Sequence, residues 1–257
     1  MSSQPIPSIP VDWNDLITVI VGTGSTERKF TAHASVLKRI DFFKGCLSAD
    51  MKEAKERLVR LPEDNPDMFE DLLHWAYFDG YQCDLEAFAV ECRALSSGRS
   101  KEDTAKEVYW EEVKKRVRVY AFARKMCAEM ASNAAIDTLW KHYDHWTPGA
   151  AQLGIALDEL DGGDALLRLF KKKTSAQIYG TSGGLKEWMG HDKGWNSDLN
   201  DRYDFMKFIL EAMAEYPDSD NECWSFSNPC EWHTHVNTPK CASISDKDAG
   251  PEAASVG

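Results

Sequence analysis

The sequence predicts an α+β fold, with a small sheet near the N-terminus and helices through most of the remainder. Three observations support this prediction. A β-branched run, Leu16 to Val21, is followed by a glycine-containing turn and a second strand-like segment. Residues 58–61 form another short run of strand character. Beyond residue 108, apolar side chains recur at intervals of three and four, which is the spacing of amphipathic helices.

Residues 16–21 and 28–31 predict a β-hairpin. The turn between them contains Gly22-Thr23-Gly24, which could also open a dinucleotide-binding fingerprint. Glu27 stands where that fingerprint has its third glycine, and strand-like residues follow in place of a helix. The pattern therefore favours a hairpin over a nucleotide site.

Helices are expected around the third strand. The apolar spacing in residues 33–48 predicts one or two short helices, with Phe42 and Phe43 in the core. A longer helix should begin at Pro66, because proline fits the first helical position and Asn65 can cap the first turn. A further helix is expected from about residue 84 to 95.

The second half of the chain predicts several more helices. A long helix is expected to carry one stripe of five residues, namely Val113, Val117, Tyr120, Arg124 and Cys127. Another helix should cover residues 132–145. In the last predicted helix, residues 199–215, the expected core stripe is Leu199, Tyr203, Met206, Leu210 and Met213.

These patterns divide the chain into six segments. They are a flexible N-terminus (1–11), a first domain (12–97), a linker (98–107), a helical extension (108–216), a Cys/His-rich tail segment (217–243) and a disordered tail (244–257).

Charge and composition exclude several classes of protein. A net charge of -12 and a pI near 5.1 argue against a nucleic-acid partner. The two basic runs, at residues 114–116 and 171–173, are expected on solvated helix faces. No apolar stretch approaches the ~20 residues that span a bilayer, and the first ten residues lack a signal-peptide pattern. We therefore expect an intracellular protein, in the cytoplasm or nucleus, with reduced thiols.

The first domain resembles the BTB/POZ family, in particular its fungal type. The resemblance rests on five elements in order: the first strand and hairpin, Phe30-Thr31-Ala32-His33, Phe42-Phe43, Leu61-Pro62-Glu63-Asp64-Asn65-Pro66, and the helix that contains Trp75 and Tyr77. It covers residues 12–95 and implies a small sheet flanked by helical hairpins. The family binds proteins and catalyses no reaction of its own. Residues 118–123 and 133–137 are similar to the helical extension that follows many fungal members, whereas residues 150–196 match no part of the pattern.

The resemblance also suggests two interaction surfaces. Asp15 and His33 correspond to positions near the family's homodimer interface, although Ala34 replaces the basic residue that many members carry after this histidine. The run Met51-Lys52-Glu53 is similar to the motif of cullin-binding members, a hydrophobic residue, any residue, then glutamate. The methionine could enter an apolar pocket while Glu53 meets a basic rim. The alternative is an exposed helix end within a charged run.

A group of cysteine and histidine residues near the end is the one candidate for metal chemistry. Cys230, His233, His235 and Cys241 supply the sulfur and imidazole ligands that tetrahedral zinc prefers. Their spacing, Cys-x2-His-x-His-x5-Cys, is not that of a usual zinc finger. The alternative is an aromatic, cysteine-containing tail packed over the helices without a metal. A closed set of four protein ligands leaves no open position for catalysis, so a structural zinc, not a catalytic one, is the candidate cofactor beside the metal-free alternative.

The sequence carries no catalytic motif for a nucleophile elbow, a phosphate-binding loop or a zinc protease. We therefore predict a protein without enzymatic activity. Two functions stay open. One is an interaction module that self-associates or recruits a partner, with substrate adaptor of a cullin-type ubiquitin ligase as one form of that role. The other is a metal-binding regulatory protein.

Overall fold

The computed structural model describes residues 12–81, 99–143, 148–182, 184–191, 202–217 and 229–241. The chain folds into two compact units. Unit 1 comprises Met1–Asp84 and Arg118–Ala135, and unit 2 comprises Leu85–Val117 and Ile136–Gly257. In the described ranges, none of the helices combines the length and the apolar character needed to cross a bilayer.

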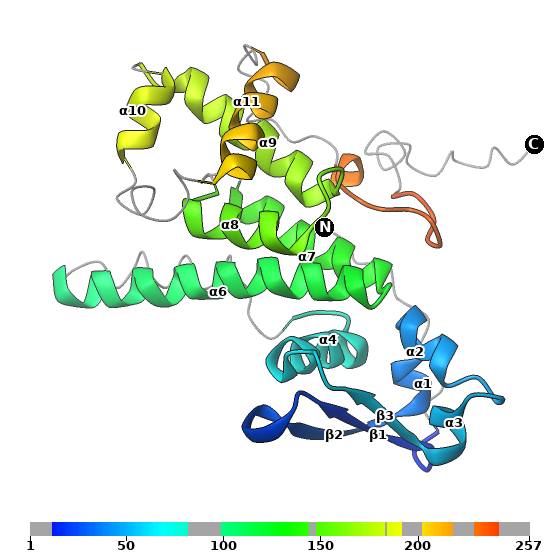
Figure 1. Cartoon of the computed structure of the whole chain (residues 1–257). Helices are drawn as coiled ribbons and strands as arrows, with labels where there is room; N and C mark the ends of the chain where they lie inside the picture. Colours follow the sequence, from blue (N-terminus) through cyan, green and yellow to red (C-terminus); the bar gives the residue numbers. More distant parts are fainter. Residues whose placement is uncertain are drawn as a thin grey trace, which may run out of the picture. The chain divides into compact units, whose positions relative to one another are not determined.

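A three-stranded mixed sheet forms the base of unit 1 (Figure 1). Its strands are β1 (Leu16–Val21), β2 (Arg28–His33) and β3 (Leu58–Leu61), in the order β2-β1-β3. β2 pairs antiparallel with β1, whereas β3 pairs parallel with it. All three strands occur where the sequence predicts them, and the predicted α+β class is confirmed at this level.

The turn between β1 and β2 depends on glycine. Gly22 has a φ of +81°, and a Cβ atom there would lie 3.0 Å from the Thr26 carbonyl oxygen. A short 3-10 turn, η1 (Gly24–Thr26), then leads into β2. The Gly-x-Gly pattern is thus part of a hairpin, as predicted.

Three short helices connect β2 to β3, namely α1 (Ala34–Leu37), α2 (Asp41–Cys46) and α3 (Lys52–Glu56). They lie together at one end of the sheet, whereas α4 (Pro66–Phe78) lies over the sheet (Figure 1). α4 begins as predicted, since the Asn65 side chain accepts a hydrogen bond of 2.8 Å from the Asp67 N–H. The predicted helix at residues 84–95 falls outside the described residues.

The core of unit 1 forms between the sheet and its helices. Alternate β1 residues, Ile17, Val19 and Val21, face inward and pack with Phe43 and Phe69, which are both fully buried. Phe42 is 37% exposed, so the prediction that both phenylalanines enter the core is wrong for Phe42. The two residues are adjacent on a helix, and adjacent positions do not share a face.

Unit 2 is helical throughout most of its described residues. The helices that follow unit 1's sheet are α6 (Arg99–Lys125), α7 (Glu129–Tyr143), α8 (Ala150–Glu159), α9 (Ala165–Gly180), α10 (Gly184–His191) and α11 (Tyr203–Glu215). α6 and α7 are divided between the two units. The structure differs from the predicted linker at 98–107, because α6 already begins at Arg99.

The buried faces of α6 and α11 differ from their predicted stripes. Val113, Val117 and Tyr120 of α6 are buried as expected, but Arg124 and Cys127 are exposed. In α11 the buried residues are Phe205, Phe208, Ile209 and Ala212, whereas Tyr203 is 83% and Leu210 62% exposed. α11 is apolar on two neighbouring stripes, and the stripe with the two phenylalanines and isoleucine offers more apolar area to bury.

The basic run of α9 is also placed differently from the prediction. Lys171 and Lys173 are buried in unit 2, not solvated. The Lys171 ammonium lies 2.8 Å from Glu211 and 2.7 Å from Glu215, both on α11. Burial acts to lower the pKa of Lys171, but the two carboxylates outweigh it and raise the pKa. In the run at 114–116, Arg116 is likewise buried.

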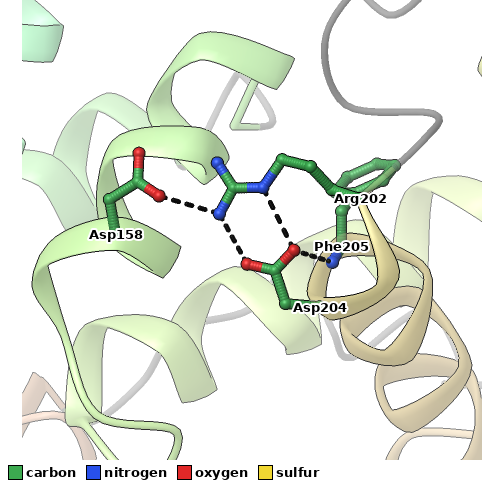
Figure 2. Close-up of polar contacts among 4 residues, drawn as sticks. All are labelled: Asp158, Arg202, Asp204 and Phe205. Atoms are coloured by element: carbon green, nitrogen blue, oxygen red, sulfur yellow. Dashed lines mark hydrogen bonds and ion pairs between the residues drawn. The ribbon is translucent and has the colours of Figure 1, made fainter.

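A second ionic contact joins α8 to the start of α11 (Figure 2). The Arg202 guanidinium donates to both carboxylate oxygens of Asp204, at 3.0 Å and 2.5 Å, and to Asp158 at 2.8 Å. Asp204 also accepts the Phe205 N–H at 2.9 Å, within the first turn of α11. The hydrogen bond from Arg202 is the main cause of the lowered pKa of Asp204.

We expect Arg202→Lys to destabilise unit 2 by about 1 kcal/mol at neutral pH, because lysine cannot span two carboxylates with a planar fork. The magnitude is small because Asp158 and Asp204 are roughly half exposed. Because the pKa of Asp204 is lowered on folding, its ionised carboxylate stabilises the fold above the pKa that Asp204 has in the unfolded chain. This stabilisation is lost as the pH falls through the pKa of Asp204 in the folded chain. The difference between variant and wild type should therefore shrink in acid.

Urea denaturation at neutral and acidic pH measures this effect. Arg168→Lys is the matched control, since Arg168 is exposed on α9. Equal unfolding free energies for Arg202→Lys and the control would contradict the proposed role of the fork.

Candidate metal centre

The candidate metal centre lies in the segment that begins with η4 (Pro229–Glu231). Trp232 fixes this segment on unit 2, because it is only 2% exposed. Lys172 of α9 adds two contacts. Its ammonium lies 5.3 Å from the Trp232 ring centroid and 3.6 Å from the Glu231 carboxylate. The tail segment is thus packed against a helix, as the metal-free alternative also expects.

Three of the four residues that the sequence nominates form one close group in this segment, and the fourth, His233, contacts one member of it. The ligand atoms of Cys230, His235 and Cys241 all lie within 4.8 Å of one another. Cys230 Sγ is 3.1 Å and Cys241 Sγ 3.9 Å from His235 Nε2. His233 joins this cluster through Cys241, whose sulfur lies 3.0 Å from His233 Nδ1.

His233 is oriented by a carboxylate on α7. Its Nε2 lies 2.8 Å from Asp137 Oδ1, and its side chain is only 6% exposed. The carboxylate can only accept a hydrogen bond, so the neutral imidazole carries its proton on Nε2 and has its lone pair on Nδ1. That lone pair is on the nitrogen beside Cys241. A carboxylate that holds the outer nitrogen of a ligating histidine is a frequent feature of zinc sites.

His235 has a similar arrangement. Its Nε2 is near the two sulfurs, whereas its Nδ1 lies 3.3 Å from the Thr238 hydroxyl. Thr238 is three residues away along the chain. Both histidines therefore have one nitrogen directed at the cysteines and the other beside a polar side chain.

The interatomic distances are compatible with a tetrahedral ion. Bonds of about 2.0–2.1 Å to nitrogen and 2.3 Å to sulfur separate tetrahedral ligand atoms by roughly 3.5–3.8 Å. Within the group of Cys230, His235 and Cys241 the sulfur–nitrogen distances are 3.1 and 3.9 Å, which bracket that value. His233 Nδ1 lies 3.0 Å from Cys241 Sγ and would have to move closer to the other two residues to complete the set. Thiol-to-imidazole hydrogen bonds would account for the shorter distances without a metal. Such hydrogen bonds do not, however, require that the second nitrogen of each histidine also has a polar partner, as His233 Nε2 has in Asp137 and His235 Nδ1 has in Thr238.

The Cys241 thiol is protonated at neutral pH in the metal-free arrangement. Partial burial, together with the neighbouring Cys230 thiol, raises the pKa of Cys241 to about 11. A metal ion must therefore displace a proton from this thiol when it binds, so binding should be favoured at higher pH.

The other predicted site residues lie in unit 1. Met51 is the N-cap of α3 and is 44% exposed, and Lys52 pairs with Glu56 at 3.7 Å. Glu53 lines a cavity of about 180 Å³ whose wall also includes Phe42. Among the cavity's other lining residues are Cys46, Leu58, Val59 and Arg60.

Asp15 and His33 both take part in contacts within unit 1. The Asp15 carboxylate accepts from Arg57, whose Nε donates to the Leu16 carbonyl at 2.9 Å. His33 Nδ1 lies 2.8 Å from the Tyr77 hydroxyl, and the Trp13 ring packs edge-on to the histidine at 5.0 Å. Trp13 is 72% and Leu16 42% exposed, so an apolar surface adjoins both residues.

Sequence reasoning missed the residues that support these sites from a distance. Asp137 is 96 positions from His233, and Arg57 is 42 positions from Asp15. No spacing rule connects such pairs. Asp137 lies in the middle of the predicted helix 132–145, but nothing local distinguishes it from a solvated carboxylate.

Comparison with known proteins gives no family assignment. The chain matches no family model, and no curated protein matches it.

Proposed function

We propose that this chain is a protein-interaction module of the BTB/POZ type, without enzymatic activity, whose helical second unit carries a structural zinc site. The observation that carries the interaction proposal is the topology of unit 1. The hairpin β1-β2, the short helices α1 to α3, the parallel strand β3 and then α4 follow in the order that the resemblance implies.

The first proposed surface is the start of α3. Met51 is exposed beside Glu53, and the cavity next to Glu53 gives a partner side chain a place to enter. This combination of an apolar anchor and an adjacent carboxylate supports recruitment of a cullin-type scaffold, with the chain as substrate adaptor. Such a role fits an intracellular protein.

We expect Met51→Ala and Glu53→Ala each to reduce capture of a cullin-type scaffold by about tenfold or more, because a central anchor dominates binding. Proximity labelling by the full chain in its native cell measures the capture. Met130→Ala is a matched control at 45% exposure, and Glu63→Ala removes an exposed carboxylate elsewhere in unit 1. Absence of any cullin-type scaffold from the wild-type sample would contradict this partner.

The second proposed surface is the patch of Trp13, Leu16, Asp15 and His33, through which we propose that the chain forms a homodimer. Its two apolar side chains are exposed next to an ion pair, a combination common at interfaces. We expect light scattering to give a dimer for wild type and a monomer for Leu16→Asp, since a charge would be buried against the partner copy.

Phe78→Ser is the control for this surface. Phe78 is 69% exposed on α4, so its replacement should leave the dimer intact. A strictly monomeric wild-type chain at high concentration would contradict self-association.

The second candidate function is metal binding, and the single observation that favours it is the convergence of Cys230, His235 and Cys241, with His233 beside Cys241 and Asp137 behind His233. Two sulfurs and two imidazole nitrogens are the donor set that favours zinc over magnesium or calcium. Cys230, His233, His235 and Cys241 would hold the ion, which would stabilise a short segment that has little core of its own.

We expect the full chain, purified without added metal, to contain about one zinc ion, because structural sites survive purification. Cys230→Ser should lose most of the zinc, whereas Cys127→Ser, which removes an exposed cysteine of unit 1, should retain it.

Asp137→Ala should still bind zinc, but with an affinity about 10- to 100-fold weaker than wild type, whereas Asp161→Ala should bind zinc as wild type does. Elemental analysis and competition with a chelator measure both effects. Less than about 0.2 zinc per wild-type chain would contradict a tight site.

A further inference from the structure

The two cysteines are the parts of the candidate metal centre that can be oxidised. Zinc itself has no redox chemistry, whereas cysteine thiolates react with peroxides. Oxidation of both thiolates would leave His233 and His235 as the only ligands. Structural zinc sites hold their ion with four ligands, so a pair of imidazoles would not retain it tightly.

The geometry brings the two sulfurs within reach of each other and of solvent. Cys230 Sγ and Cys241 Sγ lie within 4.8 Å of one another. Cys241 is exposed, and Cys230 is partly buried. Cys230 lies in η4, where its carbonyl accepts the His233 N–H at 3.3 Å, but Cys241 lies outside helix and strand. A movement of Cys241 toward Cys230, to the ~2.05 Å of a disulfide, therefore breaks no regular backbone hydrogen bonds.

We propose that Cys230 and Cys241 form a reversible redox pair, in which a hydroperoxide converts the zinc-bound thiolates to a disulfide and releases the metal. This inference rests on the proposed zinc site. It assigns to that site a regulatory input, namely the peroxide level of the cell.

The reaction balances with hydrogen peroxide as the oxidant. The exposed Cys241 thiolate attacks one peroxide oxygen, the O–O bond breaks, and the departing hydroxide takes a proton to become water. The Cys230 thiolate then attacks the resulting sulfenic acid. The S–O bond breaks, a second water leaves after protonation, and the disulfide forms. Two electrons pass from two sulfurs to one peroxide, and the zinc ion is released unchanged.

Loss of the metal would also release the tail segment from α7. His233 is positioned between Cys241 and Asp137, and its contact with Asp137 connects this cluster to α7. Asp137 is 43% exposed, so this contact alone contributes little. The oxidised tail would keep the contact of its buried Trp232 with Lys172 of α9.

The test uses zinc-loaded full chain freed of reductant and treated with a small excess of hydrogen peroxide. A chromogenic chelator such as 4-(2-pyridylazo)resorcinol reports released zinc, and peptide mapping reports disulfides. We expect nearly all of the zinc to be released together with formation of a Cys230–Cys241 disulfide. Reduction followed by added zinc should restore the starting metal content.

Cys127→Ser is the matched control and should release zinc at the wild-type rate, because Cys127 belongs to unit 1. Retention of zinc under conditions that oxidise Cys127 would overturn the redox inference and leave the zinc site standing. A disulfide between other cysteines would do the same. A wild-type chain that contains no zinc before treatment would instead contradict the metal site itself.

Discussion

The parallel pairing of β3 with β1 is the constraint on which the arrangement of unit 1 depends. β2 already returns the chain to the end of the sheet where β1 begins, because His33 pairs with Leu16. β3 starts at the same end, where Leu58 pairs with Thr18, but on the opposite side of β1, so the connection from β2 must pass that end of β1. This connection consists of α1, α2 and α3, which gather at one end of the sheet (Figure 1). Arg57 is the last residue of this connection before β3. Its backbone adopts the left-handed conformation that ends α3, its carbonyl accepts the Thr18 N–H, and its side chain donates a hydrogen bond to the Leu16 carbonyl.

This constraint also determines which residues of unit 1 are available to a partner. β1 is the central strand, so its backbone groups are paired on both edges within the sheet. The surface around Met51 lies on the crossover, and the surface around Asp15 and His33 lies where β1 begins and β2 ends. Arg57 contacts both regions of the chain, since it follows α3 directly and binds Asp15. A partner that displaced Arg57 from Asp15 would weaken the contact that aligns β3 with β1.

The sequence predicted the strands well because their signals are local. β-branched runs, glycine in a turn and a capped helix start at Asn65 each depend on residues within a few positions, and the structure has all of them. The errors concern which face of a helix is buried. α11 offers two apolar stripes, and only its neighbours decide between them. The larger apolar area of the Phe205, Phe208 and Ile209 stripe favours one rotation, and the pairing of Lys171 with Glu211 and Glu215 supports the same rotation of α11 against α9. The burial of Lys171 was missed for the same reason, because its counter-charge Glu215 lies 44 residues away along the chain.

The candidate metal centre depends both on local sequence signals and on a contact between residues that are far apart along the chain. Its four candidate ligands fall within twelve residues, so their types and spacing can be recognised from the sequence alone. Whether these residues are oriented to bind one ion cannot be recognised from the sequence, because the orientation depends on Asp137 of α7, which directs the His233 lone pair toward Cys241. A histidine without such a partner can exchange tautomers, which presents an N–H to the sulfur, or rotate its ring, which presents a C–H, and neither offers a lone pair to a metal beside that sulfur. The carboxylate thus couples two properties of unit 2. Whatever stabilises the docking of the tail on α7 also prepares the ligand set, and by linkage a metal bound at the proposed site would strengthen that docking by the same coupling free energy.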